Sequence, residues 1–234
     1  MSEMINFRYL GLAELEKLEL NLKNYNQFIV TQFISHAACT TRVLDFGAGI
    51  GTLSNLWSKQ ELASLITCFE PDERQVKILL ERGLSGSTSL SEDSEFDYIF
   101  TSNVLEHIED DRATIKYLFN HLGQDGKLGI FVPANKFIYS HIDKRFKHFR
   151  RYSKKDLIEK IAESGFEIDS CVFVDSIGLL AWLFLKIFKL QISESGSRLL
   201  LIYDKFIWPI SQFLDKLGLK YLFGKNLLLL ASKK

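Results

Sequence analysis

A glycine-rich segment from Asp45 to Gly51 holds the first residues with the spacing of a ligand site. It reads Asp-Phe-Gly-Ala-Gly-Ile-Gly, so glycine recurs at every second position. Such a pattern lets the backbone turn sharply and come closer to a ligand than side chains would allow. A tight turn between a strand and a helix uses the same residues. The segment alone therefore leaves open whether a ligand binds there.

Two further residues bear on the kind of ligand. The nicotinamide and flavin pattern G-x-G-x-x-G would need glycine at position 52, where this chain has Thr52. Glu70 lies about twenty residues beyond the glycine segment, where an acid can bind both ribose hydroxyls of a cofactor. Glu70 suits either a dinucleotide or an adenosyl cofactor, whereas Thr52 disfavours the dinucleotide.

A third segment makes the pattern specific. Residues 96–108 read Phe-Asp-Tyr-Ile-Phe-Thr-Ser-Asn-Val-Leu-Glu-His-Ile. With the glycine segment and Glu70, in this order and spacing, the chain resembles class I S-adenosylmethionine-dependent methyltransferases of the broad type 11 and type 12 groups. The similarity covers roughly Arg42 to Val174. It implies an α/β, Rossmann-like fold with a seven-stranded sheet of order 3-2-1-4-5-7-6, and S-adenosyl-L-methionine as the cofactor.

The resemblance also implies a set of cofactor contacts. Asp45 and the glycine backbone would hold the methionine part, Glu70 the ribose, and Asn103 would lie against the methionine end. The family often carries an acid after its third strand for adenine, but residues 84–90 contain none, which leaves backbone groups near Ser89. The implied cofactor-binding residues are Asp45, Gly47, Ala48, Gly49, Gly51, Glu70, Pro71, Ser89 and Asn103. Glu106 and His107 are interpreted mainly as groups that cap and orient the loop.

Methyl transfer to a hydroxyl benefits from a general base, and histidine is the usual choice near neutral pH. We predict His148 as this base, with Tyr139 and Asp143 as orienting groups; an alternative is that the loop residues only tie the loop to the domain. Residues 136–155 contain eight lysines or arginines against a single acid, Asp143. This local charge suits an anionic acceptor group, although a solvated charged surface would look the same.

The elements that must position these residues follow from hydrophobic periodicity. Short apolar runs alternate with helical patterns, which indicates a mostly parallel sheet with ligand sites after the strands. The predicted strands cover residues 42–46, 65–70, 96–101, 127–132, 166–174 and 226–231. Helical spacing from Leu15 to Phe33 predicts one long N-terminal helix, and a capping box predicts another from Ser153 to just before Gly165. We expect one domain over 1–234, with a helical lead-in over 1–40 and a helical insertion over 176–223.

The insertion contains an apolar stretch, 177–190, that has two interpretations. It is too short and too charged at its end to span a bilayer. One interpretation is a substrate lid packed on the core. The other is interfacial docking, with Trp182, Phe184 and Phe188 at the acyl boundary and the basic loop over lipid headgroups.

Composition limits the remaining choices. The chain has 29 lysines and arginines and 29 aspartates and glutamates. The protein as a whole therefore has no net electrostatic attraction for nucleic acid. The N-terminal residues lack a secretory pattern, which predicts a cytoplasmic protein. A peripheral position at the inner face of the membrane is compatible with this prediction. The three cysteines, Cys39, Cys68 and Cys171, lack metal-site spacing and are expected to be reduced core thiols, with no metal in the site.

The sequence therefore predicts an S-adenosylmethionine-dependent methyltransferase. The expected reaction is methyl transfer to oxygen of a small-molecule or lipid- or glycan-linked acceptor. Two alternatives stay open: a non-catalytic protein that binds the cofactor as a sensor or partner subunit, and a nicotinamide-dependent oxidoreductase, which Thr52 disfavours.

Overall fold

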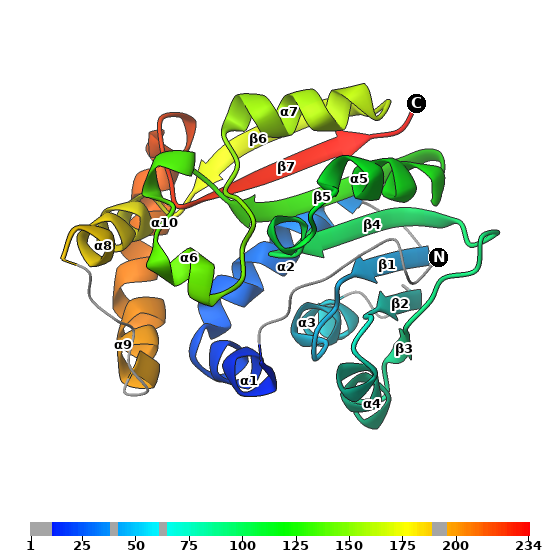
Figure 1. Cartoon of the computed structure of the whole chain (residues 1–234), viewed down its shortest axis with the longest axis horizontal. Helices are drawn as coiled ribbons and strands as arrows, with labels where there is room; N and C mark the ends of the chain where they lie inside the picture. Colours follow the sequence, from blue (N-terminus) through cyan, green and yellow to red (C-terminus); the bar gives the residue numbers. More distant parts are fainter. Residues whose placement is uncertain (1–10, 38–41, 61–64, 189–195) are drawn as a thin grey trace.

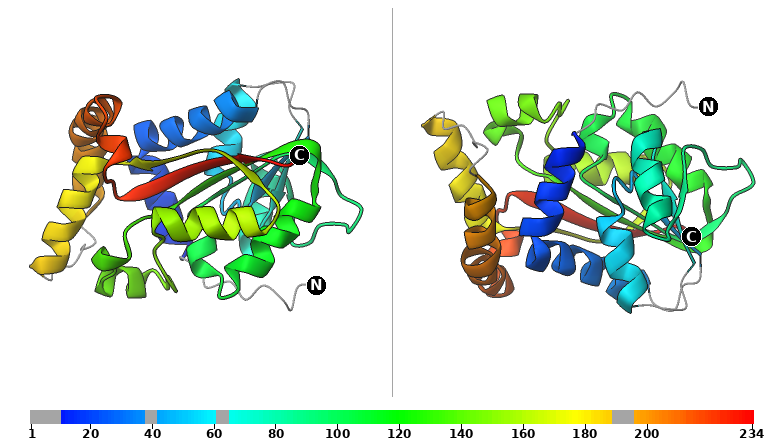
Figure 2. Two further views of the ribbon diagram at one scale, coloured as in Figure 1. Left: turned by 90° about the horizontal axis from the view of Figure 1, so that it is seen from above. Right: turned by 90° about the horizontal axis from the view of Figure 1, so that it is seen from below.

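A mixed seven-stranded sheet crosses the molecule, with helices on both faces (Figures 1 and 2). The computed structural model describes residues 11–37, 42–60, 65–188 and 196–234. The strands are β1 (Arg42–Phe46), β2 (Leu65–Phe69), β3 (Ser85–Ser87), β4 (Phe96–Ser102), β5 (Leu122–Pro133), β6 (Glu167–Val174) and β7 (Asn226–Ser232). Their order is β3-β2-β1-β4-β5-β7-β6, with β7 antiparallel to both of its neighbours. The predicted sheet is confirmed.

The sheet is buried on both faces, which explains why its central strands are apolar runs. On β1, Leu44 and Phe46 join one core cluster, while Val43 joins the cluster on the opposite face. The flanking helices include α3 (Thr52–Gln60), α4 (Glu73–Glu81), α5 (Asp111–Asn120) and α7 (Lys154–Glu163), while the short α6 (His141–Arg145) lies in the segment between β5 and α7. Ser153 caps α7 as predicted, because its side chain accepts a hydrogen bond from the Asp156 amide. Cys68 and Cys171 are free and buried, whereas Cys39 lies outside the described residues.

The N-terminal prediction of one long helix is wrong. Two helices form, α1 (Leu12–Asn21) and α2 (Lys23–Ala37), and the break is at Leu22, whose φ of −115° and ψ of 49° are not helical. Helix α2 packs on the sheet beside α3. The change of direction brings α1 over the glycine segment, where Leu15 approaches Gly49. The periodicity continues across the break, so the sequence pattern did not show it.

The described residues between β6 and β7, 175–188 and 196–225, contain a group of helices at one end of the sheet, drawn in yellow to orange-red (Figures 1 and 2). They are α8 (Ser176–Ile187), α9 (Gly196–Ile202), a π-helical turn η3 (Tyr203–Ile207), α10 (Trp208–Lys216) and a short turn η4 (Leu219–Tyr221). Trp208 anchors the group, since its fully buried ring lies against the rings of Tyr25 and Phe28. None of the described helices has the length and apolar character needed to cross a bilayer.

Candidate active site

A cavity of about 300 Å³ lies at the carboxyl ends of β1, β2, β4 and β5. Sites of this type are expected there in a parallel sheet, because the strand ends and the loops that follow them converge at one edge. Six of the predicted cofactor residues line it: Asp45, Gly47, Ala48, Gly49, Glu70 and Asn103. Gly51, Pro71 and Ser89 do not line this cavity.

The three glycines of the segment have different surroundings. All have positive φ, at 79° for Gly47, 58° for Gly49 and 80° for Gly51, a conformation that favours glycine. A Cβ at Gly47 would lie 2.5 Å from Val104, and one at Gly51 would lie 2.5 Å from Leu84. A Cβ at Gly49 would meet nothing closer than 3.5 Å. Packing therefore requires Gly47 and Gly51 to lack a side chain, while a Cβ at Gly49 would make ordinary contacts with Gln75 and Leu15.

Two buried acids hold this end of the cavity in place. Asp45 accepts a hydrogen bond from Ser54 Oγ at 2.7 Å, and burial raises the pKa of Asp45 to about 7. Glu70 is 1% exposed and accepts a hydrogen bond from the Gly49 amide at 2.8 Å through Oε2. Its Oε1 accepts another from the Asp72 amide at 3.1 Å. The glycine segment is thus tied to the end of β2 by the same carboxylate that the resemblance assigns to the ribose.

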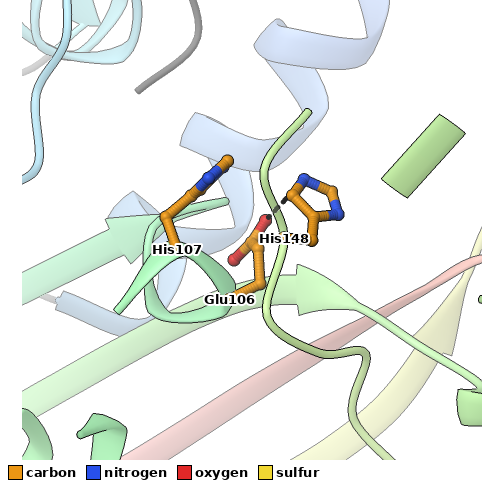
Figure 3. Close-up of side chains that lie close together, drawn as sticks. All are labelled: Glu106, His107 and His148. Atoms are coloured by element: carbon orange, nitrogen blue, oxygen red, sulfur yellow. Dashed lines mark ion pairs between the residues drawn. The ribbon is translucent and has the colours of Figure 1, made fainter. Parts of the chain in front are cut away.

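The other end of the cavity contains Glu106, His107 and His148 (Figure 3). Glu106 is fully buried, and neither carboxylate oxygen accepts a hydrogen bond from another described residue. His148 Nε2 lies 3.9 Å from Glu106 Oε1, and the His107 and His148 rings are nearly perpendicular with centroids 4.7 Å apart. Burial raises the pKa of Glu106 to about 7, against the opposing charge of His148. A proton taken up by His148 would therefore lie beside a carboxyl group that can balance its charge.

The interpretation of Glu106 as a helix cap is wrong. The turn η1 (Leu105–His107) has no side-chain cap, and the helix after it, α5, is capped by Asp110. Glu106 instead points toward His148, which belongs to a loop about forty residues further along the chain (Figure 3). Burying a carboxyl group without a hydrogen-bond donor from another residue costs free energy. Such a position is typical of a functional group.

Asp143 orients His148. It is fully buried, and its Oδ1 lies 3.0 Å from His148 Nδ1 and 2.7 Å from Arg151 Nε. Burial acts to raise the pKa of Asp143, but the hydrogen bond from His148 and the charge of Arg151 outweigh it and hold the pKa below its usual value. An ionised Asp143 accepts a proton from Nδ1, so His148 Nε2, 3.9 Å from Glu106 Oε1, is the ring nitrogen that faces the cavity group.

Three further residues of the basic loop, 136–155, have structural partners. Tyr139 donates its hydroxyl hydrogen to the His148 carbonyl at 2.7 Å, so it fixes the loop backbone and does not line the cavity. Arg150 pairs with Asp111 at 2.9 Å and Arg151 pairs with Asp143. Both arginines therefore pair with buried acids, and the binding of an anionic acceptor by this loop stays a prediction.

Several cavity residues were not predicted to lie there. Tyr25 comes from α2, Trp182 from α8, Asn226 from the first position of β7, and Lys225 immediately precedes that strand. The Arg151 guanidinium lies 4.5 Å from the Trp182 ring centre, so Trp182 forms part of the cavity wall instead of reaching an acyl boundary. No local motif marks these positions, because they meet the glycine segment only through the tertiary fold.

Comparison with known proteins agrees with this geometry. A family model described as a methyltransferase domain matches residues 13–170. The chain belongs to this methyltransferase-domain family. Its cofactor is S-adenosyl-L-methionine, and the nicotinamide-dependent alternative is wrong. None of the curated proteins matches the chain.

Solved structures share the fold at low sequence identity. A SAM-dependent methyltransferase from Archaeoglobus fulgidus is 18% identical, with a TM-score of 0.62 over 94% of this chain and 98% of that one. Phosphoethanolamine N-methyltransferase 2 from Haemonchus contortus, solved with S-adenosyl-L-methionine, is 17% identical, with a TM-score of 0.59 over 90% of this chain and 52% of that one. The [4+2]-cyclase SpnF is 16% identical, with a TM-score of 0.59 over 98% of both chains. The acceptor therefore has to be argued from the site.

Proposed function

We propose that this protein methylates an oxygen atom of a small-molecule or lipid- or glycan-linked acceptor, with His148 as the general base. The observation that carries the proposal is the hydrogen-bonded pair of Asp143 and His148. His148 Nε2 lies beside Glu106, in the same cavity as the glycine segment. S-adenosyl-L-methionine supplies a methyl group already activated on a sulfonium, so the protein mainly has to align the acceptor and receive its proton.

The proton transfer follows from the hydrogen-bonding pattern. If the bound cofactor gives its methyl group to the acceptor oxygen, with S-adenosylhomocysteine as the second product, His148 Nε2 would accept the proton of the acceptor hydroxyl. Asp143 stabilises the resulting imidazolium through Nδ1, and Glu106, 3.9 Å from Nε2, adds negative charge when ionised. The predicted absence of a metal stays a prediction, since Glu106, His107 and His148 place possible ligand atoms within 4.8 Å of one another.

The surroundings of this base favour an acceptor that combines an apolar part with an anionic group. Phe146 and Trp182 line the cavity beside His148 and supply an apolar wall that limits access of water. Lys144 and Lys147 are exposed on α6 and the turn after it, one to four residues before His148. A phosphate or carboxylate of the acceptor could interact with these lysines while its hydroxyl reaches Nε2.

The test is transfer of a labelled methyl group from S-adenosyl-L-methionine into fractions of cell extract. Replacing His148 by alanine should lower the rate about 10²- to 10⁴-fold, the usual contribution of a general base. Affinity for S-adenosylhomocysteine should stay the same, because His148 lies at the other end of the cavity. His141→Ala, which removes an exposed histidine of α6, is the matched control and should leave both quantities unchanged.

Two results would contradict the proposal in distinguishable ways. Full activity of the His148→Ala protein would remove the base assignment but keep the methyltransferase. Cofactor binding by the wild-type protein with no label transferred into any fraction would favour the non-catalytic sensor instead.

A further inference from the structure

The helices between β6 and β7 expose apolar side chains on the side that faces away from the sheet. Helix α9, the turn η3 and α10 form one helical run over 196–216. Large apolar residues recur along its outer side at intervals of three and four, the spacing of one helix face. They are Leu199, Ile202, Phe206, Ile210, Phe213 and Leu217, each at least 50% exposed. A surface helix normally places polar residues on that face.

The orientation of this run is fixed by its opposite face. Asp204 accepts hydrogen bonds from the backbone amides of Asn24 and Tyr25, both at 2.9 Å. Trp208 is fully buried, and Asp215 accepts a hydrogen bond from the Asp175 amide at 2.8 Å. Because these contacts hold the inner face against the domain, the apolar outer face is a stable feature of the fold.

Helix α8 extends the same exposed region. It packs against α10, and the two lie together at one end of the molecule (Figures 1 and 2). Leu180, Phe184, Ile187 and Phe188 are each more than 50% exposed. We call the exposed apolar residues of α8, α9, η3 and α10 the outer helical surface. Exposed patches of this extent mark interaction sites in soluble proteins.

The charges on this region indicate the partner. Among the described residues of 176–221, the acids are Asp204 and Asp215, and both are buried. Arg198, Lys205 and Lys216 are exposed on the same helical run. An exposed surface that combines large apolar groups with basic charge alone is complementary to the headgroups and upper acyl region of an anionic bilayer.

A second copy of the chain fits this surface less well. A two-fold interface pairs a surface with itself, so Lys205 and Lys216 of both copies would lie in one interface without exposed acids from these helices. Like charges across an interface oppose association, and interface cores are depleted in lysine. Anionic lipid provides the missing counter-charge.

We propose that the outer helical surface binds the face of an anionic lipid bilayer, with α8, α9 and α10 at the headgroup boundary. Trp182, on the inner side of α8, lines the cavity, so the helix that would contact lipid also forms a wall of the active site. An acceptor carried in the bilayer would then be close to the cavity. The proposal does not depend on methyl transfer, because binding to lipid can be measured without acceptor or cofactor.

The experiment is co-sedimentation with vesicles of equal parts phosphatidylglycerol and phosphatidylcholine, compared with vesicles of phosphatidylcholine alone. The wild-type protein should bind the anionic vesicles more tightly, and added salt should weaken that binding. Replacing Phe206 and Phe213 together by serine should lower vesicle affinity at least about ten-fold, since two phenyl groups lose their apolar contact. Replacing Lys205 and Lys216 together by glutamate should lower affinity for the anionic vesicles by about ten-fold or more.

The matched control replaces two exposed leucines on the other side of the molecule. Leu65→Ser with Leu80→Ser removes side chains that are 73% and 57% exposed on β2 and α4, and should leave vesicle binding unchanged. All these substitutions are at the surface. Thermal melting followed by circular dichroism tests whether each variant is folded. Light scattering without lipid reports the oligomeric state of each.

Three results would overturn the proposal. One is no sedimentation of the wild-type protein with anionic vesicles at low salt. Another is equal binding by wild type and both outer-surface variants. The third is a wild-type dimer that the Phe206→Ser, Phe213→Ser protein fails to form, with no binding to vesicles, because a second copy would then cover the surface.

Discussion

The two ends of the cavity are built in different ways. At the cofactor end, one segment supplies the glycines, and the acids Asp45 and Glu70 already have hydrogen-bond donors in the protein. At the acceptor end, Glu106 comes from the loop after β4 and His148 from the loop after β5, and the Glu106 carboxylate accepts no hydrogen bond from another described residue. The first end is organised by local sequence, the second by tertiary packing.

This difference has a chemical consequence. Groups with partners in place hold a fixed geometry, which suits recognition of an invariant cofactor. Asp45 and Glu106 both have a pKa raised to about 7, but Glu106 has no hydrogen-bond donor from another described residue, so it is poised to change its charge when a proton moves nearby. We therefore expect substitutions at the cofactor end to change binding, and substitutions at the acceptor end to change turnover and pH dependence.

The largest effect on binding is expected at Gly49. Its φ of 58° disfavours other residues, and a valine side chain would lie against Gln75 and Leu15 in the cavity wall. Gly49→Val should weaken binding of S-adenosylhomocysteine at least about 100-fold, equivalent to about 2.7 kcal/mol, measured by calorimetry. Gly83→Val is the matched control, because Gly83 has a φ of 75° with nothing within 4 Å. If both variants bind the cofactor like wild type, Gly49 does not face it.

A smaller loss is expected at Glu70. Glu70→Ala removes a carboxylate that holds the Gly49 amide and is assigned to the ribose. A hydrogen bond to a charged group is worth about 1.5–3 kcal/mol, so affinity for the cofactor should fall roughly ten- to a hundred-fold. Glu73→Ala, an exposed acid in the first turn of α4, is the control and should bind normally. Identical titration curves for the two variants would contradict the role of Glu70.

The smallest effect concerns stability and depends on pH. Glu106 has a usual pKa of 4.5 and a folded-state pKa of about 7. Between these values the folded protein holds a proton at this site that the unfolded chain has lost, so the free energy of unfolding falls as pH rises. Glutamine cannot lose that proton. Glu106→Gln should therefore match wild type near about pH 5 and exceed its free energy of unfolding by about 1–3 kcal/mol near about pH 8.

Urea denaturation at both pH values measures this difference. Asp45, whose pKa is also raised to about 7, titrates in both proteins, so subtracting one curve from the other isolates Glu106. A stability difference that does not change with pH would show that the folded protein does not raise the pKa of Glu106.

The sequence predicted the parts of the molecule that depend on neighbouring residues. Strand β1 has the predicted bounds, 42–46, because an apolar run buried on both faces is unambiguous. The glycine segment and Glu70 reach the cavity because each directly follows a strand of the parallel sheet. The order of all seven strands came from the family resemblance and is confirmed.

Features set by distant contacts were missed. The break at Leu22 lies within continuous helical periodicity, and it is the position of α1 over the glycine segment that requires it. An acid at the start of a helical turn looks like a cap, so Glu106 could not be recognised as a partner of His148. The stretch 177–185 is uniformly apolar, so the sequence could not show that Trp182 faces inward while Phe184 faces outward.

The most direct test of the account is a calorimetric titration of the wild-type protein with S-adenosylhomocysteine and, separately, with NAD. The glycine segment, Glu70 and the family assignment predict one saturable site for S-adenosylhomocysteine and no heat of binding for NAD. Preformed geometry at the cofactor end predicts that His148→Ala gives the same isotherm as wild type. Binding of NAD in preference to S-adenosylhomocysteine would contradict the assignment of the cavity and of the chemistry derived from it.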